Sequence, residues 1–187
     1  MKTYGCLKRS VRDKNQIILY DTYAEILLYN KEGNETARTK IDIDKVEKIK
    51  NIKWRYDLKN HYVVTGSSKQ TKFIHAYLIN IPKGMVVDHI DRNRLNNLSS
   101  NLRLVTYSQN GMNKGKQSNN TSGIVGVSWD KSRNKWEAHI KINKKKLHLG
   151  RFKNKEDAIN ARKEAEIKYF GEYRCKNPNI NTVFKNK

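Results

Sequence analysis

Asp88 and His89 form an adjacent acid and imidazole pair that suits chemistry on a phosphodiester. Hydrolysing this bond requires a base that takes a proton from water and a hard cation that offsets negative charge on the phosphate and the leaving oxygen. His89 suits the role of base, because the neutral form of an imidazole predominates near neutral pH. Asp88 suits the role of cation ligand, because its carboxylate supplies an anionic oxygen.

Amide side chains that follow this pair add neutral oxygen donors. Asn110 offers one to the same cation, and oxygen donors of this kind suit Mg²⁺ or Mn²⁺, with water and DNA phosphate completing the coordination. Asn101 is expected to position the site, because its amide can tie a polar loop to the backbone and so hold His89 in place. Zinc would prefer more nitrogen or sulfur ligands, so one divalent Mg²⁺ or Mn²⁺ ion is the expected cofactor.

The elements around the pair have to bring these side chains to one place. We expect a strand, a polar Asn-rich loop and a second strand over residues 85–90, 91–101 and 102–105. A helix then starts at Thr106, because Thr106 and Gln109 have the spacing of a capping box. Asp88 and His89 would point to opposite faces of a regular strand, so the strand must twist or end there if both serve one site. The alternative is a surface strand and loop whose Asn residues cap turns.

The run from Asp88 to Asn113 resembles the HNH nuclease motif in its His-Asn-Asn form, as found in phage and intron-encoded homing endonucleases with a ββα-metal fold. The similarity covers about residues 72–113 and rests on the Asp-His pair, an Asn-Leu-Arg run and the helix Asn. The resemblance implies a general base, two metal ligands and a central structural Asn, which are His89, Asp88 with Asn110, and Asn101.

Three details refine what this resemblance implies. Arg92 stands where a Gly often follows the Asp of the loop. No cysteine pairs flank the motif, so the zinc-stapled variety of HNH protein is not expected, and neither is structural zinc. Asn113 lies three residues after Asn110 on the same helix face, so Asn113 is the alternative metal ligand.

The first 70 residues have the composition of a small, antiparallel β-rich region. β-Branched and aromatic residues gather in four segments, over residues 17–29, 36–43, 54–58 and 61–65. Asp44 is expected to cap a short helix that runs to Lys50, because Val46 and Ile49 share one face. The apolar segment from Ile74 to Ile79 fits a helix or a strand equally well.

The segment from Gly111 to Gly123 is rich in Asn, Lys, Ser and Gly and has the composition of a linker. Three alternating segments follow and predict strands, over residues 124–129, 136–142 and 146–152. A helix is then expected between an Asn154 N-cap and a Gly171 stop. Because three strands cannot cover both of their own faces, we expect this helix to cover one of them.

This last block, with its SGIVGVSW, KWEAHI and LGRF runs, is similar to the Apetala-type domain of plant ethylene-response factors over about residues 122–171. In that family a three-stranded sheet lies in the major groove of DNA and a helix packs behind it. Strand alternation turns Trp136, Ala138 and Ile140 toward the helix, and it turns Leu147 inward as well.

The outward side chains of this sheet have the chemistry of DNA contacts, because basic groups bind phosphates or guanine edges. The residues expected to contact DNA are Trp129, Lys131, Arg133, His139, Lys141, Lys146 and His148. For Trp129, plain packing is the alternative to a contact with a sugar or a thymine methyl. The plant domains carry several Arg on this face, so base readout is expected to be weaker here.

The charge of the chain implies a polyanionic partner. Its 187 residues hold 39 Lys and Arg against 18 Asp and Glu, a formal net charge of +21. Double-stranded DNA fits best, since both halves of the chain are basic. No membrane partner is expected, because the longest apolar stretches fall far short of a span. The amino terminus lacks a signal peptide and Cys6 and Cys175 suit a reducing compartment, so a cytoplasmic protein of a bacterial or phage-infected cell is expected.

These features predict an α+β protein with a DNA-contacting β-rich region, a ββα-metal nuclease core, a flexible linker, a three-stranded antiparallel sheet packed on one helix, and a polar tail. The expected boundaries are 1–71, 72–113, 114–121, 122–171 and 172–187. The expected function is metal-dependent, site-specific cleavage of DNA by a homing-type endonuclease, which acts as a monomer and nicks one strand because it has a single catalytic centre. The alternatives are a non-catalytic, sequence-specific DNA-binding regulator with a decayed nuclease fold, and an RNA-binding or ribosome-associated basic protein, which leaves the Asp-His pair unexplained.

Overall fold

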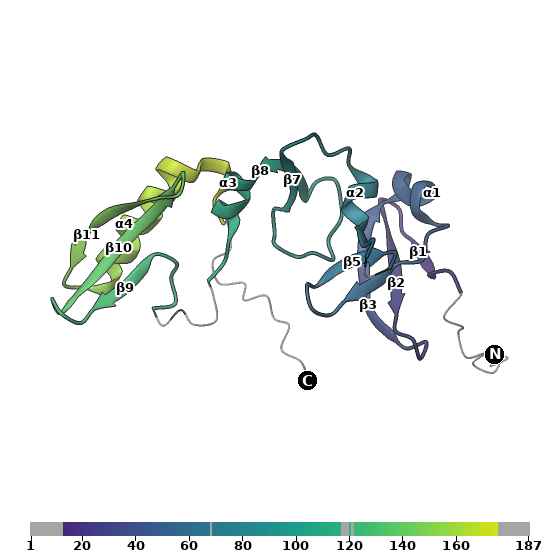
Figure 1. Cartoon of the computed structure of the whole chain (residues 1–187), viewed down its shortest axis with the longest axis horizontal. Coiled ribbons are helices and arrows are strands. Elements are labelled where there is room, and N and C mark those ends of the chain that lie inside the picture. The colour runs from purple at the N-terminus through teal and green to yellow at the C-terminus, as the bar shows by residue number, and fades with distance from the viewer. Residues whose placement is uncertain (1–12, 68, 117–119, 121, 176–187) are drawn as a thin grey trace. The chain divides into compact units, whose positions relative to one another are not determined.

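The chain has a mixed α+β architecture with several small sheets (Figure 1). The computed structural model describes residues 13–67, 69–116, 120 and 122–175. The expectations for Cys6, for linker positions 117–119 and 121, and for the tail from residue 176 onward lie outside these residues. Two compact units emerge. The N-terminal unit runs up to His89 and includes Asn93–Leu104, and the C-terminal unit comprises Ile90–Arg92 and the chain from Val105 onward.

Two antiparallel sheets of three strands form the framework of the N-terminal unit. The first has the order β1 (Ile17–Leu19), β2 (Tyr23–Tyr29), β3 (Glu35–Asp42), and the second β4 (Arg55–Asp57), β5 (Tyr62–Thr65), β6 (Lys72–Phe73). Ala24, Ile26 and Leu28 of β2 are fully buried, as alternation requires of a strand with one covered face. They join Trp54 and Ile74 in one apolar core. The predicted β-rich region is therefore confirmed.

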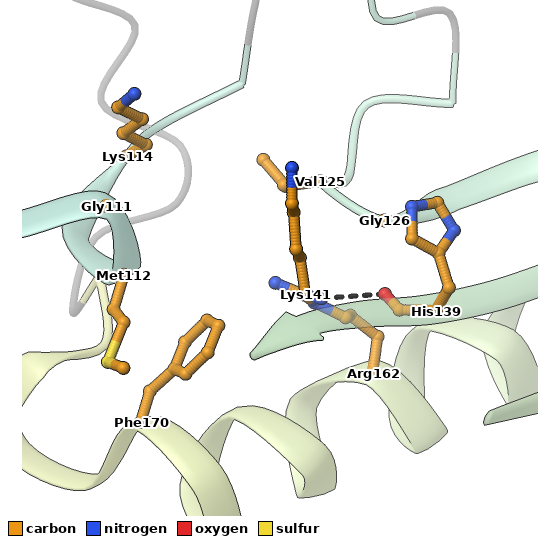
Figure 2. A pocket seen from close by; sticks show the side chains of 9 residues that line it. All are labelled: Gly111, Met112, Lys114, Val125, Gly126, His139, Lys141, Arg162 and Phe170. Carbon is orange, nitrogen blue, oxygen red and sulfur yellow. Dashed lines mark hydrogen bonds between the residues drawn. The ribbon is translucent and has the colours of Figure 1, made fainter. Parts of the chain in front are cut away.

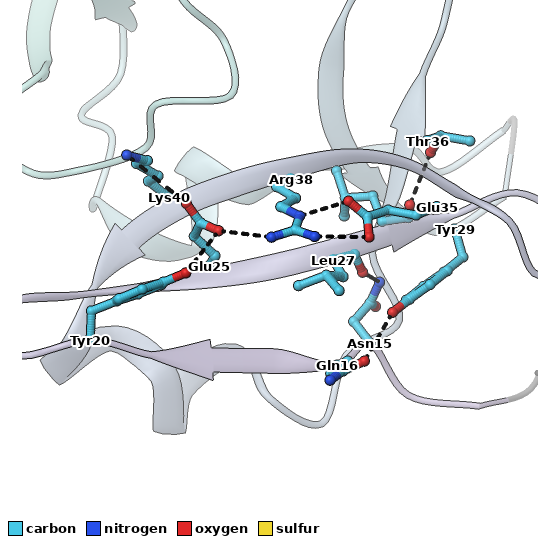
Figure 3. A network of polar contacts seen from close by, with 11 residues as sticks. Asn15, Gln16, Tyr20, Glu25, Leu27, Tyr29, Glu35, Thr36, Arg38 and Lys40 are labelled. Atoms are coloured by element: carbon cyan, nitrogen blue, oxygen red, sulfur yellow. Dashed lines mark hydrogen bonds and ion pairs between the residues drawn. The ribbon is translucent and has the colours of Figure 1, made fainter. Parts of the chain in front are cut away.

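Polar contacts occupy the other face of the first sheet (Figure 3). Glu25 on β2 pairs with Arg38 and Lys40 of β3, at 3.5 and 4.0 Å. Asn15 ties the chain that enters β1 to the next strand, since its Nδ2 donates to Leu27 O at 2.7 Å. Ion pairs thus link β2 to β3, and Asn15 links β2 to the chain that enters β1.

Short helices connect the strands of this unit. η1 (Ile43–Lys45) and α1 (Val46–Ile49) follow β3, and α2 (Ile74–Leu78) follows β6. The expectation that Asp44 caps the first helix is wrong, because the helix begins at Ile43 and the Asp44 carboxylate pairs with Lys45 at 2.8 Å. The segment that fitted a helix or a strand is a helix, which places Ile74 and Leu78 one turn apart on the buried side.

A two-stranded sheet and a short helical segment carry the residues of the motif. β7 (Met85–His89) pairs with β8 (Leu102–Thr106), and α3 (Tyr107–Asn110) and η2 (Gly111–Asn113) follow directly. The predicted capping box is confirmed, because Thr106 Oγ1 accepts from Gln109 N at 3.2 Å and Gln109 Oε1 accepts from Thr106 N at 2.8 Å. The helix therefore starts at the residue that the sequence indicates.

The loop between β7 and β8 lies along β3 of the first sheet. Lys40 N donates to Leu95 O at 2.9 Å, and Asn97 N donates to Lys40 O at 2.8 Å. Further along, the Asp42 carboxylate accepts from Ser99 N at 2.8 Å. The β-rich region thus holds the Asn-rich loop of the motif by backbone pairing, within one compact unit.

Three antiparallel strands backed by one helix make up most of the C-terminal unit. The sheet has the order β11 (Lys145–Phe152), β10 (Lys135–Ile142), β9 (Val127–Asp130), and α4 (Lys155–Phe170) and η3 (Gly171–Tyr173) follow. Ala138 and Ile140 of β10 are fully buried, Ala138 beside Ala158 and Ile140 beside Ala165 of α4. The expected sheet on a single helix is therefore confirmed.

Some local expectations for this unit need correction. Leu147 lies across from Ile140 and shares its face, but it is 41% exposed because it sits on the edge strand β11. Asn154 is the N-cap of α4, yet its side chain makes no capping hydrogen bond. Gly171 ends the helix with a φ of 51°, a conformation that favours glycine. No helix in the described part of the chain has the length and apolarity needed to cross a membrane.

The short helix η2 packs on the core between the sheet and α4 of the C-terminal unit. Met112 lies against the cluster of Ile140, Ala165 and Phe170, and Figure 2 shows the end of the Met112 side chain beside Phe170. Met112 was the single apolar residue in a segment with linker composition. This packing of the partly buried Met112 ties the residues that directly follow the motif helix to the core of the C-terminal unit.

Candidate active site

His89, the last residue of β7, is buried in the N-terminal unit with 4% of its surface exposed. Its Nε2 lies 3.1 Å from Oδ1 of Asn97, a residue of the following loop that is 1% exposed. Tyr62 and His75 close the other sides of the imidazole, with ring centroids at 6.1 and 5.6 Å. A base in such a setting has one fixed orientation, which is what proton transfer requires.

Asn97 is itself held by three hydrogen bonds. Its Nδ2 donates to Thr39 Oγ1 at 2.9 Å and to Arg94 O at 3.1 Å, and its backbone N donates to Lys40 O at 2.8 Å. Thr39, on β3, is fully buried. The amide of Asn97 therefore connects the imidazole of His89 to β3 of the N-terminal sheet.

Asp88 contacts a different neighbour from His89, as expected for successive residues of a strand. Both Nε and Nη2 of Arg103 on β8 donate to Asp88 Oδ2, at 2.9 and 2.7 Å. The Asp88 side chain is 7% exposed and that of Arg103 16%. A carboxylate whose position is fixed by a guanidinium offers oxygen donors, the ligand type that a hard divalent cation prefers.

His75 of α2 stacks on Phe73 and meets His89 edge-on, with ring centroids at 5.4 and 5.6 Å. Its Nδ1 is buried, and no described group lies within hydrogen-bonding reach of it. Burial, and then the charge of His89, lower the pKa of His75 to about 4. His75 is therefore neutral near neutral pH.

The Asn residues of the motif take separate positions. Asn101 Nδ2 donates to Asn96 O at 2.8 Å, a contact that ties the polar loop to its own backbone. In the C-terminal unit, Asn110 is half-buried at the end of α3, and Asn113 is buried with its Nδ2 3.4 Å from Ile90 O. Asn110 and Asn113 thus remain two candidates for the neutral metal ligand.

The donor set suits a hard divalent cation by its chemistry, since it offers carboxylate and amide oxygens. Within the described ranges, no three His, Cys, Asp or Glu side chains gather where they could hold a metal ion.

The sheet of the C-terminal unit carries its basic residues on the face opposite α4. Cross-strand register pairs Glu137 with Arg151, His139 with His148, and Lys141 with Lys146 on this outward face. Glu137 lies 3.1 Å from Lys146 Nζ and 3.5 Å from His148 Nδ1. Acidic residues therefore tether part of the basic set while leaving the side chains exposed.

A second carboxylate organises the basic residues near the β9–β10 turn. Asp130 pairs with Arg133 at 3.2 Å and with Arg151 at 3.4 Å. A hydrogen bond from Ser132, and then those from Arg133, lower the pKa of Asp130 to about 2. Lys131 lies in the same turn and is exposed. Arg151 was missed in the sequence, because strict alternation from His148 puts Gly150 on the outward face, and only the bulge between the two pairs brings Arg151 there.

Trp129 lies on the other face of this sheet. The register places it opposite Trp136, whose ring it meets at 5.3 Å and 64°, on the side that α4 covers. Trp129 is 43% exposed. The structure therefore separates Trp129 from the outward basic residues and brings it together with the core side chain Trp136.

A small pocket of about 130 Å³ opens beside the edge of β10. Figure 2 shows Lys114 and Met112 on one side and His139 and Lys141 on the other, with Arg162 of α4 between them. Arg162 Nη1 donates to His139 O at 2.7 Å. Burial, and then the charge of Lys146, lower the pKa of His139. His139 is therefore a partly buried member of the basic face.

Sequence reasoning did not find Thr39, Asn97 and Arg103 as site residues. Thr39 and Asn97 are far apart in the chain, and nothing in the local pattern marks either residue. Arg103 belongs to the Asn-Leu-Arg run of the motif, and its pairing with Asp88 follows once β7 and β8 are set side by side. Of these three residues, only Arg103 could therefore have been identified from the sequence motif.

Comparisons with known proteins show similarity to HNH endonucleases. A family model described as HNH endonuclease matches residues 80–112. Protein 3.8 of Escherichia phage T7 is 45% identical over 60 residues, which are 32% of this chain and 50% of that protein. The uncharacterized HNH endonuclease L560 of Acanthamoeba polyphaga mimivirus is 32% identical over 142 residues, 73% of each chain. The chain thus spans half the length of the phage protein, and no solved structure matches it.

Proposed function

Because this chain belongs to the HNH endonuclease family, we propose that it is a metal-dependent, site-specific endonuclease of the homing type that hydrolyses one strand of double-stranded DNA. A nuclease domain implies a nucleic acid substrate in general. The observation that carries the proposal is the buried His89, held at 3.1 Å by Asn97 beside the ion pair of Asp88 and Arg103. Neighbouring bases and acids held in fixed geometry are what phosphodiester hydrolysis needs.

In this mechanism His89 takes a proton from water. The water oxygen attacks phosphorus, the bond from phosphorus to the leaving oxygen breaks, and the leaving oxygen takes up a proton from solvent. Arg103 keeps the Asp88 carboxylate in place through the contacts to Oδ2 at 2.9 and 2.7 Å.

HNH nucleases generally use a divalent metal ion, and Asp88 with Asn110, or with Asn113 instead, would hold it here. When bound, a divalent cation offsets the negative charge of the phosphate and the leaving oxygen. Oxygen donors favour Mg²⁺ or Mn²⁺ over zinc. We propose Mg²⁺ or Mn²⁺ as the cofactor on this chemistry.

The outward basic face of the C-terminal sheet is the proposed DNA-binding surface, in keeping with the similarity to Apetala-type domains. It offers the exposed Lys141, Lys146 and His148 for phosphate contacts, and Arg151 extends the same face. Lys131 and Arg133 lie in the turn beside it. The net charge of +21 supports a polyanionic substrate of this kind.

The proposal of a nick follows from the number of candidate bases. The chain has one Asp-His pair, so a monomer attacks one phosphodiester each time it docks on DNA. A homodimer would place two centres on one duplex and produce a double-strand break. Whether the first product is nicked or linear DNA therefore shows whether a monomer or a homodimer cuts the DNA.

Incubation of the purified chain with supercoiled plasmids that carry random inserts tests the proposal. We expect open circular DNA to appear with Mg²⁺ or Mn²⁺ and not with a chelator, and mapped ends to cluster at one sequence. His89→Ala, purified in the same way, is the matched control for contaminating nucleases. DNA binding without cleavage under all metal conditions would instead identify a non-catalytic regulator, and direct conversion to linear DNA would refute the monomeric nickase.

A further inference from the structure

We propose that Thr39, on β3 of the N-terminal sheet, is a positioning residue that fixes which ring nitrogen of His89 carries the proton. Thr39 acts through Asn97, and the inference rests on the proposed function only where it calls His89 a base. The three residues are 0%, 1% and 4% exposed, so water does not compete for the hydrogen bonds between them. The donor and acceptor in the hydrogen bond between Thr39 and Asn97 then determine the donor and acceptor in the hydrogen bond between Asn97 and His89.

Thr39 is the fixed end of this chain. Its hydroxyl has one proton, which it donates to Leu95 O at 2.8 Å, because a carbonyl can only accept. Toward Asn97 the hydroxyl oxygen therefore presents a lone pair. Leu95 O also accepts from Lys40 N at 2.9 Å, so the backbone on both sides of this contact is paired.

Asn97 must therefore donate an N–H group to that lone pair. Its Nδ2 donates to Thr39 Oγ1 at 2.9 Å and to Arg94 O at 3.1 Å, so both amide protons have acceptors. The amide oxygen is left to face Nε2 of His89 at 3.1 Å. The oxygen and nitrogen of an amide have similar sizes, so these partners, and not shape, decide which way the amide points.

An amide oxygen can only accept, so Nε2 of His89 has to be the protonated nitrogen. A neutral imidazole carries one proton, which makes Nδ1 the nitrogen with a lone pair. Rotating the Asn97 amide by half a turn would reverse this assignment. It would aim N–H at Nε2 and move the imidazole proton to Nδ1, and the base would be lost at that position.

Thr39→Val removes the hydroxyl while nearly preserving the shape of a fully buried side chain. Asn97 Nδ2 then loses one of its two acceptors, and the rotated amide is no longer opposed by Thr39. Thr39→Ser keeps the hydroxyl and is the matched control. Thr39→Ala removes the hydroxyl in a different way, so the comparison survives if one of the two variants does not fold.

The test is ¹⁵N NMR of the histidine rings in the full chain without DNA or metal, with His89→Gln identifying the signals of His89. We expect the Nε2–H tautomer in the wild type and in Thr39→Ser, and a mixed or Nδ1–H tautomer in Thr39→Val and Thr39→Ala. Cleavage of the plasmid substrate should fall by at least about tenfold in the latter two, within the range that a lost general base allows. Thr39→Ser should recover most of the rate.

Two outcomes would overturn the inference: an Nδ1–H tautomer in the wild type, or an unchanged Nε2–H tautomer in both hydroxyl-free variants. A chain with the expected tautomers that cuts no DNA would refute the proposed function and leave the assignment of Thr39 standing. The NMR measurement therefore tests the role of Thr39, and the cleavage assay tests the proposed function, each without depending on the other.

Discussion

The N-terminal unit and the C-terminal unit hold their functional side chains in opposite ways. In the N-terminal unit, His89 and Asn97 are buried, and their hydrogen bonds lead to residues distant in sequence, such as Thr39. In the C-terminal unit, Lys146 and Arg133 are exposed and pair with carboxylates in the same sheet or turn. Burial fixes one geometry, whereas surface pairs between long side chains restrain little.

This difference matches two kinds of task. Proton transfer from water needs one nitrogen at one position, and a shift of a fraction of an ångström costs rate. Binding a phosphate backbone needs positive charge over an area and tolerates side chains that move. We therefore expect changes in the N-terminal unit to act on the cleavage rate, and changes on the outward basic face to act on affinity.

The largest expected effect is that of His89→Ala. Its single-turnover cleavage rate should fall by about 10²- to 10⁴-fold, because a general base contributes that much to the rate. Affinity for duplex DNA, measured by fluorescence anisotropy in a chelator, should stay within about twofold, because a base adds little to ground-state binding. A variant that bound poorly but cut normally would reverse the comparison between the units.

The second prediction concerns the stability of the N-terminal unit at low pH. The pKa of His75 is lowered from 6.5 to about 4, so between these values the unfolded chain binds a proton that the folded chain does not. The contribution of neutral His75 to the free energy of unfolding should therefore be complete above pH 6.5. It should fall as the pH drops toward 4 and level off below pH 4. The full shift corresponds to about 3 kcal/mol.

Denaturant titrations at pH 7 and 5, followed through amide NMR signals of the N-terminal unit, measure this effect. His75→Phe should flatten the pH dependence, because the stacked position keeps an aromatic ring and loses the titrating group. His148→Gln, at an exposed histidine of the other unit, is the control and should leave it unchanged. An equal loss in the wild type and in His75→Phe would assign the sensitivity to other groups.

The third prediction removes two lysines that face each other on the outward basic face. In Lys141→Ala/Lys146→Ala, affinity for duplex DNA should fall by about tenfold at physiological salt. The slope of log affinity against log salt should also become less steep by about 1 to 2. The cleavage rate at saturating DNA should not change.

The matched control for the lysine pair is Lys163→Ala/Lys168→Ala. Both of these lysines are exposed on α4, so the variant loses the same charge from the opposite side of the sheet. An equal loss of affinity in the two double variants would show that net charge, and not the outward face, drives binding.

The smallest expected effect is that of Glu137→Gln. In the wild type, Lys146 and His148 lie 3.1 and 3.5 Å from the Glu137 carboxylate. The substitution removes this negative charge from the outward face and releases both side chains. DNA affinity should rise by about two- to fivefold, in line with the modest value of surface ion pairs. Titration of a labelled duplex measures it, with Glu164→Gln on α4 as the control. A fall in affinity would mean that Glu137 organises the lysine for binding.

The elements of the fold were largely predictable from the sequence, because their signals are local. Alternation gave β10 and β11, and the capping box of Thr106 and Gln109 gave the start of α3. The Asp44 cap failed because a polar residue near a helix start is a common pattern with several outcomes. The Ile74 segment stayed undecided because an apolar run that short has no distinctive period.

The contacts of the candidate site were less predictable. His89 and Asp88 stood out by residue type, but Asn97 lies in a loop with several Asn residues that sequence alone cannot rank. The partner of Asn97 is Thr39, which is brought to it only by the pairing of the loop with β3. Long-range hydrogen bonds of this kind depend on the register of elements far apart in the chain, and no local pattern encodes that.

The packing of Met112 on Phe170 and Ile140 bears on how chains of this family can exchange parts. If recombination joined a different C-terminal sheet and helix directly after Asn113, Met112 would lose its apolar contacts and the new core would lack the methionine side chain. A crossover in β8, ahead of Tyr107, would carry α3, η2 and their apolar contact as one inheritable cassette. Viable chimaeras should therefore have their junctions before the motif helix, and not in the polar segment that follows it.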